Sequence, residues 1–283
     1  MSRATDPGVR ARARRLALGL ATIFGLSPGG FFIPYRYAGS ARRADYPALH
    51  PLFDAATANI EAVLRAIEAH RDDLLRIAAD AGPARFDQDW FPRLDAAAAY
   101  ALVRRERPRR IVEIGSGHST RFLARAIADG GLATELVCID PAPRASLDQL
   151  RLCHHRQLLS EVDPGLFETL VPGDILFIDS SHIAMPGTDV DRLFLDILPR
   201  LGRGVLVHVH DVFLPDAYPA AWTWRGYNEQ LVAGALLQGR GYEIVFASHH
   251  VAARRPEWTE QGVLAQLPLL ADAHETSLWL RKS

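Results

Sequence analysis

A loop containing two glycines follows a short apolar run near the middle of the chain. The run ends at residue 114 with Glu113 as its one acid, and Gly115 and Gly117 come directly after it. Apolar residues at helical spacing follow, so the pattern predicts a strand, a tight turn and a helix that starts near His118 or Ser119. Glycine lets a ligand approach the backbone closely, and the first N–H groups of a helix lack partners within it. The loop therefore predicts a nucleotide-type binding site, with an ordinary strand–turn–helix corner as the alternative.

A single acid ends the next apolar run. Asp140 follows the run at 135–139 and stands 23 residues after Gly117 (140 − 117). A carboxylate at the tip of a second parallel strand can accept hydrogen bonds from both hydroxyls of a ribose. The alternative is an aspartate that serves only a solvated turn, and the spacing favours the ribose.

Two further apolar runs end in residues that can move protons. Asp179 and His182 follow the run at 173–178, and His210 and Asp211 follow the run at 204–209. Because ligands bind at the carboxyl ends of parallel strands, we expect these side chains to face the glycine loop. A histidine with a near-neutral pKa suits removal of a hydroxyl proton, so His182, with Asp179 and His210, is the predicted catalytic group. In the alternative, His182 is a turn residue bonded to an aspartate, His210 lines its strand and Asp211 caps a turn.

Strands and helices must alternate to bring these tips together. That alternation is typical of a parallel α/β sheet. Strands are predicted at 111–114, 135–139, 156–159, 173–178, 204–209, 242–247 and 277–281. Helices are predicted at 119–127, 145–152, 163–170, 189–198 and 228–238, preceded by a helical hairpin within 46–81 and a helix at 94–105.

The composition describes an ordinary globular protein. The chain has 283 residues, 48% hydrophobic and 23% charged, which suits one large domain or one domain with an extension. Its net charge of −1 gives no global electrostatic signature for nucleic acid, so no nucleic-acid partner is expected. Two cysteines make no disulfide framework, and a reducing, cytoplasmic setting is the expectation.

The N-terminal segment combines arginines with an apolar run. Four arginines between residues 10 and 15 precede the 11 residues of 16–26, which are too few to span a bilayer. We therefore expect no transmembrane segment but a basic amphipathic helix, with a secretion signal as the alternative. Contact with a membrane surface and a role in a homo-oligomer both stay open. The aromatic loop at 31–37 is expected to pack on the main domain or to act as a lid.

The glycine loop and the strand tips together resemble a known enzyme class. Glu113-x-Gly115-x-Gly117 resembles the first motif of class I S-adenosylmethionine (SAM)-dependent methyltransferases, whereas the nicotinamide fingerprint needs a third glycine where Thr120 stands. More narrowly, Asp-x-x-His at 179–182 and His-Asp at 210–211 resemble the methyltransferase 24 family. The resemblance implies a Rossmann-like, mostly parallel sheet of seven strands in the order 3-2-1-4-5-7-6, with the seventh antiparallel. Residues 96–283 would form that domain, and residues 1–95 a helical extension or lid.

The resemblance also implies a reaction. SAM would be the cofactor, and its methyl group would pass to an oxygen, less readily a nitrogen, of a small-molecule acceptor. Aromatic residues in the loop at 213–227 would line the acceptor site, among them Trp222, Trp224 and Tyr227. The cofactor-binding residues that the resemblance implies are Glu113, Gly115, Ser116, Gly117, His118, Ser119, Asp140 and Asp179.

A divalent metal is a further expectation from the resemblance. Metal-dependent O-methyltransferases place one acid at the fourth strand tip and an acidic pair at the fifth. Asp179, His210 and Asp211 occupy those places here, with a histidine where the first acid of the pair would be. Imidazole is a poor magnesium ligand and suits manganese, iron or zinc better, so the metal and structural interpretations both stay open.

Two other functions compete with methyl transfer. A nicotinamide-dependent oxidoreductase would use the same kind of loop, and Thr120 argues against it. A non-catalytic SAM-binding or assembly protein could keep the fold without turnover. Binding of SAM, S-adenosylhomocysteine and NAD distinguishes the three functions.

Overall fold

The computed structural model describes residues 7–27 and 29–283. Its contacts divide the chain into two compact units. One unit comprises residues up to 44 together with 219–226, and the other comprises 45–218 and 227–283.

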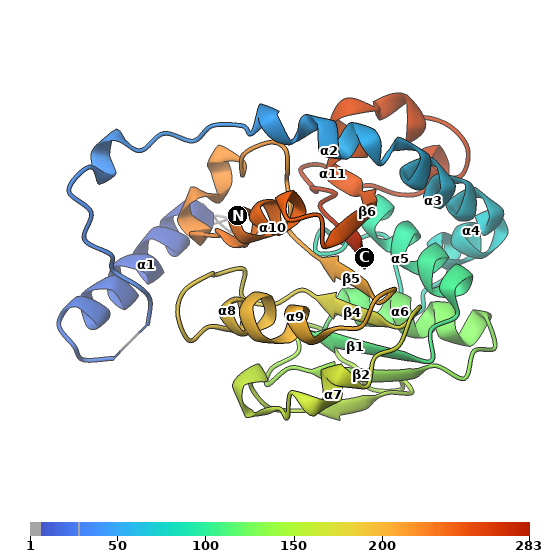
Figure 1. Ribbon diagram of the computed structural model, residues 1–283, viewed down its shortest axis with the longest axis horizontal. Coiled ribbons are helices and arrows are strands. Elements are labelled where there is room, and N and C mark those ends of the chain that lie inside the picture. Colours follow the sequence, from blue (N-terminus) through green and yellow to red (C-terminus); the bar gives the residue numbers. More distant parts are fainter. Residues whose placement is uncertain (1–6, 28) are drawn as a thin grey trace, which may run out of the picture. The chain divides into compact units, whose positions relative to one another are not determined.

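A seven-stranded sheet forms the centre of the larger unit (Figure 1). Its order is β3-β2-β1-β4-β5-β7-β6, and β7 runs antiparallel to both neighbours, as the sequence predicted. The central strands are almost wholly apolar because helices cover both faces of such a sheet. The strands are β1 Arg110–Ile114, β2 Glu135–Ile139, β3 Cys153–His155, β4 Ile175–Ile178, β5 Leu206–Val209, β6 Tyr242–Ala247 and β7 Leu278–Lys282.

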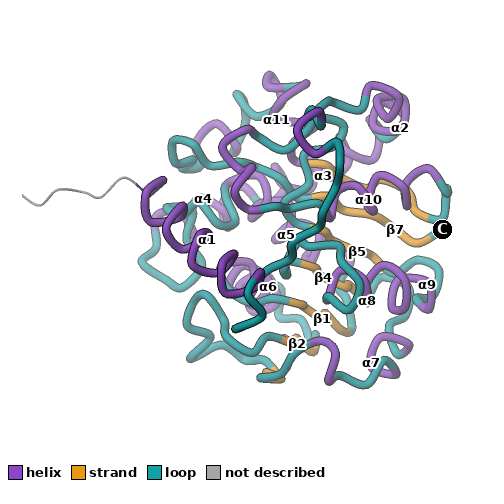
Figure 2. The backbone as a smooth tube through the Cα atoms, turned by 90° about the vertical axis from the view of Figure 1, so that its left-hand side faces the viewer, coloured by secondary structure: helices purple, strands orange, loops and turns teal. Residues whose placement is uncertain are grey.

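Helices pack on the sheet, and the most deeply buried of them is α5, Arg93–Glu106. Every side chain from Leu94 to Val103 is buried, and the alanines at 96–99 allow neighbouring helices to approach closely. Figure 2 shows α5 and α6 beside each other next to β4 and β1. The other helices are α1 Pro7–Ile23, α2 His50–Ala55, α3 Thr57–Ala69, α4 Arg71–Ala79, α6 His118–Asp129, α7 Gly165–Glu168, α8 Asp189–Arg192, α9 Leu198–Arg200, α10 Glu229–Gln238 and α11 Ser248–Arg254.

The segment between β2 and β3 differs from its prediction. No helix forms at 145–152, because the Ser146 hydroxyl accepts a hydrogen bond from the Asp148 N–H and Gln149 adopts a left-handed backbone with φ 71°. Such local side-chain bonds compete with helix formation. The third strand lies at Cys153–His155, not at 156–159, and pairs with the end of β2. The predicted strand was therefore wrong by three residues.

The division into units differs from the predicted boundary at residue 95. Helices α2, α3 and α4 belong to the same unit as the sheet, with Ile60, Val63 and Ile67 fully buried in its core. The Asn59 side-chain amide also donates a hydrogen bond of 3.0 Å to the Ile244 carbonyl of β6. These contacts place the division after residue 44. A lid function for residues 1–95 stays a prediction.

The smaller unit contains α1 and two short 3-10 helices, Ala38–Ser40 and Ala220–Arg225. The Arg43 guanidinium donates a hydrogen bond of 2.6 Å to the Pro219 carbonyl, which joins its two segments. Within residues 7–27 and 29–283, no helix is long and apolar enough to cross a membrane.

Candidate functional site

The glycine loop holds the tips of two strands against each other. Gly115 has a φ of 81°, a region that L side chains rarely adopt. A Cβ atom at this position would lie 1.8 Å from the carbonyl oxygen of Asp179 at the end of β4. Glycine is therefore required here because the backbone of the fourth tip touches the first. This contact brings the predicted cofactor loop and the predicted catalytic acid together.

Glu113 supports the loop from inside. Its side chain is fully buried and accepts hydrogen bonds from the hydroxyls of Ser119, at 2.7 Å, and Thr120, at 2.6 Å. The Thr120 hydroxyl in turn accepts from the Gly117 N–H at 2.9 Å. Burial raises the pKa of Glu113 to about 7, although these hydroxyl bonds oppose the rise. The structure thus gives Glu113 and Thr120 a shared role in shaping the turn.

Asp140 lies at the end of β2, half-buried beside the same loop. One carboxylate oxygen accepts from the Ser116 N–H and the other from the Ala142 N–H, both at 2.7 Å. Each oxygen keeps a further lone pair, so the carboxylate can still accept two hydroxyl groups. The hydroxyl oxygens of Ser116 and Ser180 are buried and have no hydrogen-bond partner within the described chain. Buried polar groups are nearly always paired, so these two atoms fit a site completed by a bound polar molecule.

The loop also has neighbours on its outer side. His118 is the first residue of α6 and is half-buried; burial and the Arg121 charge lower the pKa of its ring. The backbone N–H of Arg144 donates a hydrogen bond of 3.1 Å to the Ser116 carbonyl. The Arg144 guanidinium lies 4.5 Å from the ring centre of Trp90, which is 49% exposed. An aromatic–cation pair thus borders the glycine loop, a feature that the sequence did not single out.

His182 is buried among three carboxylates. Its Nδ1 atom lies 2.8 Å from Glu229 Oε2, and its Nε2 atom lies 3.4 Å from both Asp179 Oδ1 and Asp211 Oδ2. The backbone of His182 is left-handed with φ 60°, as is that of Asp211 with φ 56°. Such conformations are uncommon outside glycine and cluster at functional sites. The His182 carbonyl also accepts the backbone N–H of Asn228 at 3.1 Å, which ties it to the start of α10.

His210 is held in a matching way on the other side of Asp179. Its Nε2 atom lies 3.2 Å from Asp95 Oδ2. Its Nδ1 atom lies 3.5 Å from Asp179 Oδ1 and 3.6 Å from Asp211 Oδ1. Both histidines therefore turn one ring nitrogen toward the Asp179–Asp211 pair and the other toward a separate buried carboxylate.

Those two separate carboxylates, Asp95 and Glu229, were not among the predicted site residues. Asp95 lies in the first turn of α5, where an acid usually indicates only a helix start. It also accepts the backbone N–H groups of Thr276 and Ser277, both at 2.9 Å, so it anchors the chain just before β7. Glu229 lies in the first turn of α10, where an acid likewise usually indicates only the start of a helix.

In this site, neighbouring charges shift the pKa values in the direction opposite to burial. Burial alone would lower the pKa of His182 and His210, but the neighbouring carboxylates, Asp211 and Asp179 foremost, raise both pKa values well above the usual range. Burial alone would raise the pKa of Asp179, but the adjacent His210 and His182 hold it well below its usual value. The carboxylates around the two rings thus favour the protonated form of both histidines.

The predicted metal ligands lie close together at the strand tips. Searching residues 7–27 and 29–283 finds no group of three or more His, Cys, Asp or Glu side chains placed to hold a metal ion. Asp179, His210 and Asp211 do lie together, but as an ion-paired set: His210 has carboxylate oxygens near both ring nitrogens. The metal-ligand role of these three residues stays a prediction.

Of the three aromatic residues predicted to line the acceptor site, Tyr227 belongs to the larger unit with the strand tips. The Tyr227 ring lies 4.6 Å from the His182 ring, centre to centre. Trp222 and Trp224 belong to the smaller unit, where Arg225 lies 4.2 Å and 5.2 Å from their ring centres. Their part in an acceptor site stays a prediction.

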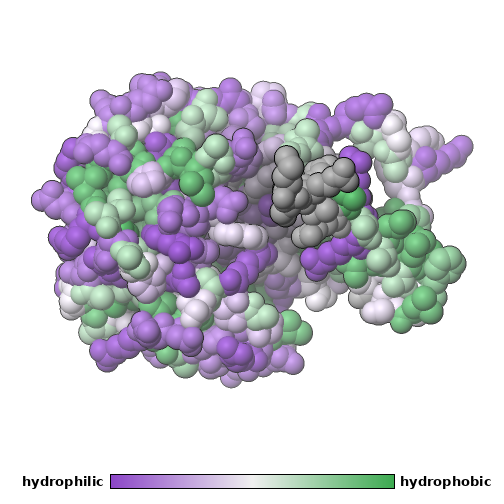
Figure 3. All heavy atoms as spheres, turned by 180° about the vertical axis from the view of Figure 1, so that it is seen from behind, coloured by the Kyte–Doolittle hydropathy of each residue, from purple (hydrophilic) through white to green (hydrophobic). Residues whose placement is uncertain are grey.

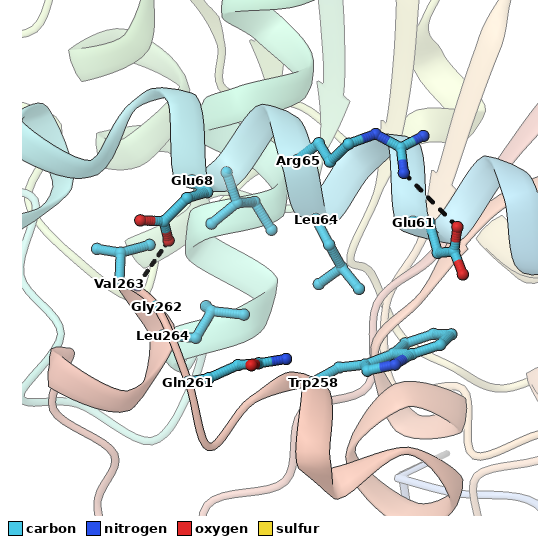
Figure 4. Close-up of a pocket in the computed structure, with 10 residues that line it drawn as sticks. Glu61, Leu64, Arg65, Glu68, Trp258, Gln261, Gly262, Val263 and Leu264 are labelled. Atoms are coloured by element: carbon cyan, nitrogen blue, oxygen red, sulfur yellow. Dashed lines mark hydrogen bonds and ion pairs between the residues drawn. The ribbon is translucent and has the colours of Figure 1, made fainter.

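A separate hollow lies between α3 and the segment at 258–264 (Figure 4). Its rim is fixed by a hydrogen bond of 2.7 Å from the Val263 N–H to Glu68 and by an ion pair of 3.6 Å between Arg65 and Glu61. None of its lining residues belongs to the predicted site.

One family model matches the central part of the chain. Residues 112–212 match the methyltransferase 24 family, described as a methyltransferase domain. No curated protein matches the chain significantly.

Several solved structures are similar to this one at low sequence identity. One is the S-adenosylhomocysteine-bound methyltransferase PaMTH1 of Podospora anserina, 16% identical, with 90% of this chain and 99% of that chain covered and a TM-score of 0.40. A second is an O-methyltransferase of Bacillus cereus in complex with S-adenosylhomocysteine, 18% identical, with coverage of 76% and 91% and a TM-score of 0.37. A third is the branched-chain polyamine synthase of Thermus thermophilus, 16% identical, with coverage of 76% and 64% and a TM-score of 0.43.

The family match begins within β1 and ends one residue beyond Asp211, so it contains the glycine loop and all four strand tips. The match covers 101 of the 283 residues, so the chain is similar to the methyltransferase 24 family over the glycine loop and the four strand tips.

Proposed function

We propose that this protein transfers the methyl group of SAM to a hydroxyl oxygen of a small-molecule acceptor. The observation that carries the proposal is the position of His182. This buried imidazole is oriented by Glu229 at 2.8 Å and lies beside Asp179, whose backbone touches the glycine loop. The proton-accepting group and the cofactor loop therefore belong to one site.

The cofactor would lie along the loop and the tip of β2. Asp140 has free lone pairs for the ribose hydroxyls, and the unpaired hydroxyls of Ser116 and Ser180 suit the polar amino-acid end. Glu113 would act indirectly, because its buried carboxyl accepts a hydrogen bond from Ser119 and supports the loop from inside. Gly115, Ser116 and Gly117 would let the cofactor approach the backbone closely, because their N–H groups already donate within the chain. The N–H groups of His118 and Ser119 at the start of α6 and the Asp179 side chain complete the proposed binding set.

The acceptor oxygen is favoured over nitrogen by the presence of a base. SAM, when bound, supplies a methyl group on a sulfonium; the oxygen–methyl bond forms as the sulfur–methyl bond breaks. A hydroxyl must also lose its proton, whereas a neutral amine can attack with its lone pair. In the proposal His182 takes that proton, and Glu229 keeps the ring oriented for the transfer. Placing the two reactants in line provides much of the remaining rate enhancement.

The charge of the cluster bears on the metal question. The His210 ring already lies against Asp179 and Asp211 with one nitrogen and against Asp95 with the other, so we expect turnover without an added divalent ion. Dialysis against EDTA should leave activity and melting temperature unchanged. Loss of activity on dialysis, with recovery on adding Mn²⁺, would contradict this expectation and restore the metal-ligand set.

The proposal is tested in two steps. Calorimetry with SAM, S-adenosylhomocysteine and NAD comes first, and NAD binding without SAM binding would overturn it. A panel of hydroxylated and amine-bearing small molecules comes second, comparing the wild type with His182→Ala. We expect His182→Ala to retain SAM binding and to lose about 10²- to 10⁴-fold in rate, the usual contribution of a general base. The control His70→Ala removes a half-buried histidine between α3 and α4 and should keep full activity.

One result would favour a different function. If the protein binds SAM tightly but no acceptor in the panel is methylated, a non-catalytic SAM-binding role fits better. If amines react and hydroxyls do not, the acceptor atom is nitrogen and His182 has another task.

A further inference from the structure

The charges of the chain are strongly segregated. Residues 7–43 contain seven arginines and neither an acid nor a lysine. Because the whole chain has a net charge of −1, the rest of the chain has a net charge of −8. The catalytic domain is thus acidic overall, and the segment with α1 is strongly basic.

Helix α1 gathers four of its exposed apolar side chains on one face. Val9, Leu16, Leu20 and Ile23 follow one another at spacings of seven, four and three residues, which places them on one face of a helix. These four side chains are between 45% and 64% exposed. Arg14 and Arg15 are exposed away from that face, and Arg12 is exposed at its edge.

The loop after α1 continues the apolar surface. Five of its side chains are more than 60% exposed: Phe24, Leu26, Phe31, Phe32 and Ile33. Figure 3 shows hydrophobic residues gathered on the right, where this loop lies. No residue of 12–27 and 29–44 is buried. An exposed apolar surface of this extent indicates a binding surface.

We propose that α1 and the loop to residue 37 dock the protein on an anionic lipid surface. A basic helix with one apolar face lies in the plane of a membrane interface, with aromatic and leucine side chains inserted below the headgroups. Lipid phosphates supply the negative charge that the arginines lack within their own segment. A second copy docked through the same helix would bring its four α1 arginines near the four of the first copy, which opposes self-association through α1. The proposal is independent of the methyl acceptor.

Vesicle binding tests the proposal with the full-length protein. Sedimentation with phosphatidylcholine vesicles is compared with sedimentation with vesicles of phosphatidylcholine and phosphatidylglycerol. We expect binding to the second kind only, weakening as salt rises. Each arginine near such a surface contributes on the order of tenfold to binding at most, so Arg12→Ala, Arg14→Ala and Arg15→Ala together should weaken it about a hundredfold.

A matched control removes the same charge elsewhere. Arg65, Arg76 and Arg85 are on the larger unit, with side chains 70%, 58% and 51% exposed, and their triple alanine variant should bind vesicles like the wild type. Phe31→Ser with Phe32→Ser should reduce binding while leaving every charge in place.

Three outcomes would overturn the proposal. The first is equal binding to neutral and anionic vesicles, and the second is equal weakening by the control triple variant. The third is a concentration-dependent dimer that the α1 triple variant abolishes, without vesicle binding by the wild type. The last result would identify a second copy as the occupant.

Discussion

Replacing Glu113 with glutamine should change how the stability of the protein depends on pH. The pKa of Glu113 is raised from 4.5 to about 7 by complete burial, so between these values the folded state holds a proton that the unfolded state has released. The free energy of unfolding therefore falls as pH rises from 4.5 to about 7 and levels off above that. At 1.36 kcal/mol per pKa unit, the full loss is about 3 kcal/mol. Glu113→Gln removes the titrating group, so the variant should gain stability relative to the wild type as pH rises.

Urea denaturation of the wild type and Glu113→Gln between pH 5 and pH 8 measures this difference. The matched control is Glu135→Gln, which removes a half-exposed glutamate at the start of the adjacent strand β2. The stability difference between wild type and Glu113→Gln should change by about 3 kcal/mol across the range, and the control difference should stay flat. A constant difference for Glu113→Gln would refute the reasoning, because it would mean that the buried carboxyl keeps an ordinary pKa.

Three further predictions concern the strand tips. Gly115→Ala places a Cβ 1.8 Å from a carbonyl oxygen, so it should cost more than about 4 kcal/mol of unfolding free energy in urea denaturation; a loss below 1 kcal/mol would exclude the close contact. Asp95→Asn removes a carboxylate from beside His210, so the pKa of that ring should fall in an NMR titration, while an unchanged pKa would limit Asp95 to anchoring β7. As a base, His182 works only when neutral, and its pKa is well above 6.5, so kcat/KM should rise with pH above neutrality. Asp211→Asn removes the strongest of the charges that raise this pKa, so the rise of kcat/KM with pH should shift to lower pH. If the pH profile of kcat/KM does not shift, His182 is not the base.

The fold was predictable because its central signals are local. The apolar run at 110–114 with two glycines after it gave β1, the turn and α6, and the resemblance supplied the order in which the strands lie. The region from 145 to 159 was predicted wrongly because its outcome depends on competition between local side-chain bonds and pairing with β2. Periodicity over so few residues cannot decide that competition.

The site was predictable only as far as the strand tips. Residues at the ends of parallel strands converge, so Asp179, His182 and the pair at 210–211 could be grouped from sequence. Asp95 stands 115 residues from His210, and it is a helix residue, so no spacing rule connects the two. The same holds for Glu229, which reaches His182 across 47 residues.

The partners of His210 explain why this chain differs from the metal-dependent pattern at that position. An acid at 210 would place its carboxylate against Asp95, which is fully buried and already accepts backbone N–H groups from Thr276 and Ser277. Two facing buried carboxylates repel, and one of them would need a proton or a cation. Histidine avoids that conflict, because one ring can face Asp95 with one nitrogen and Asp179 with the other. The residues at 95 and 210 should therefore be exchangeable only together: His210→Glu alone should destabilise the fold, and adding Asp95→Asn should recover much of the loss.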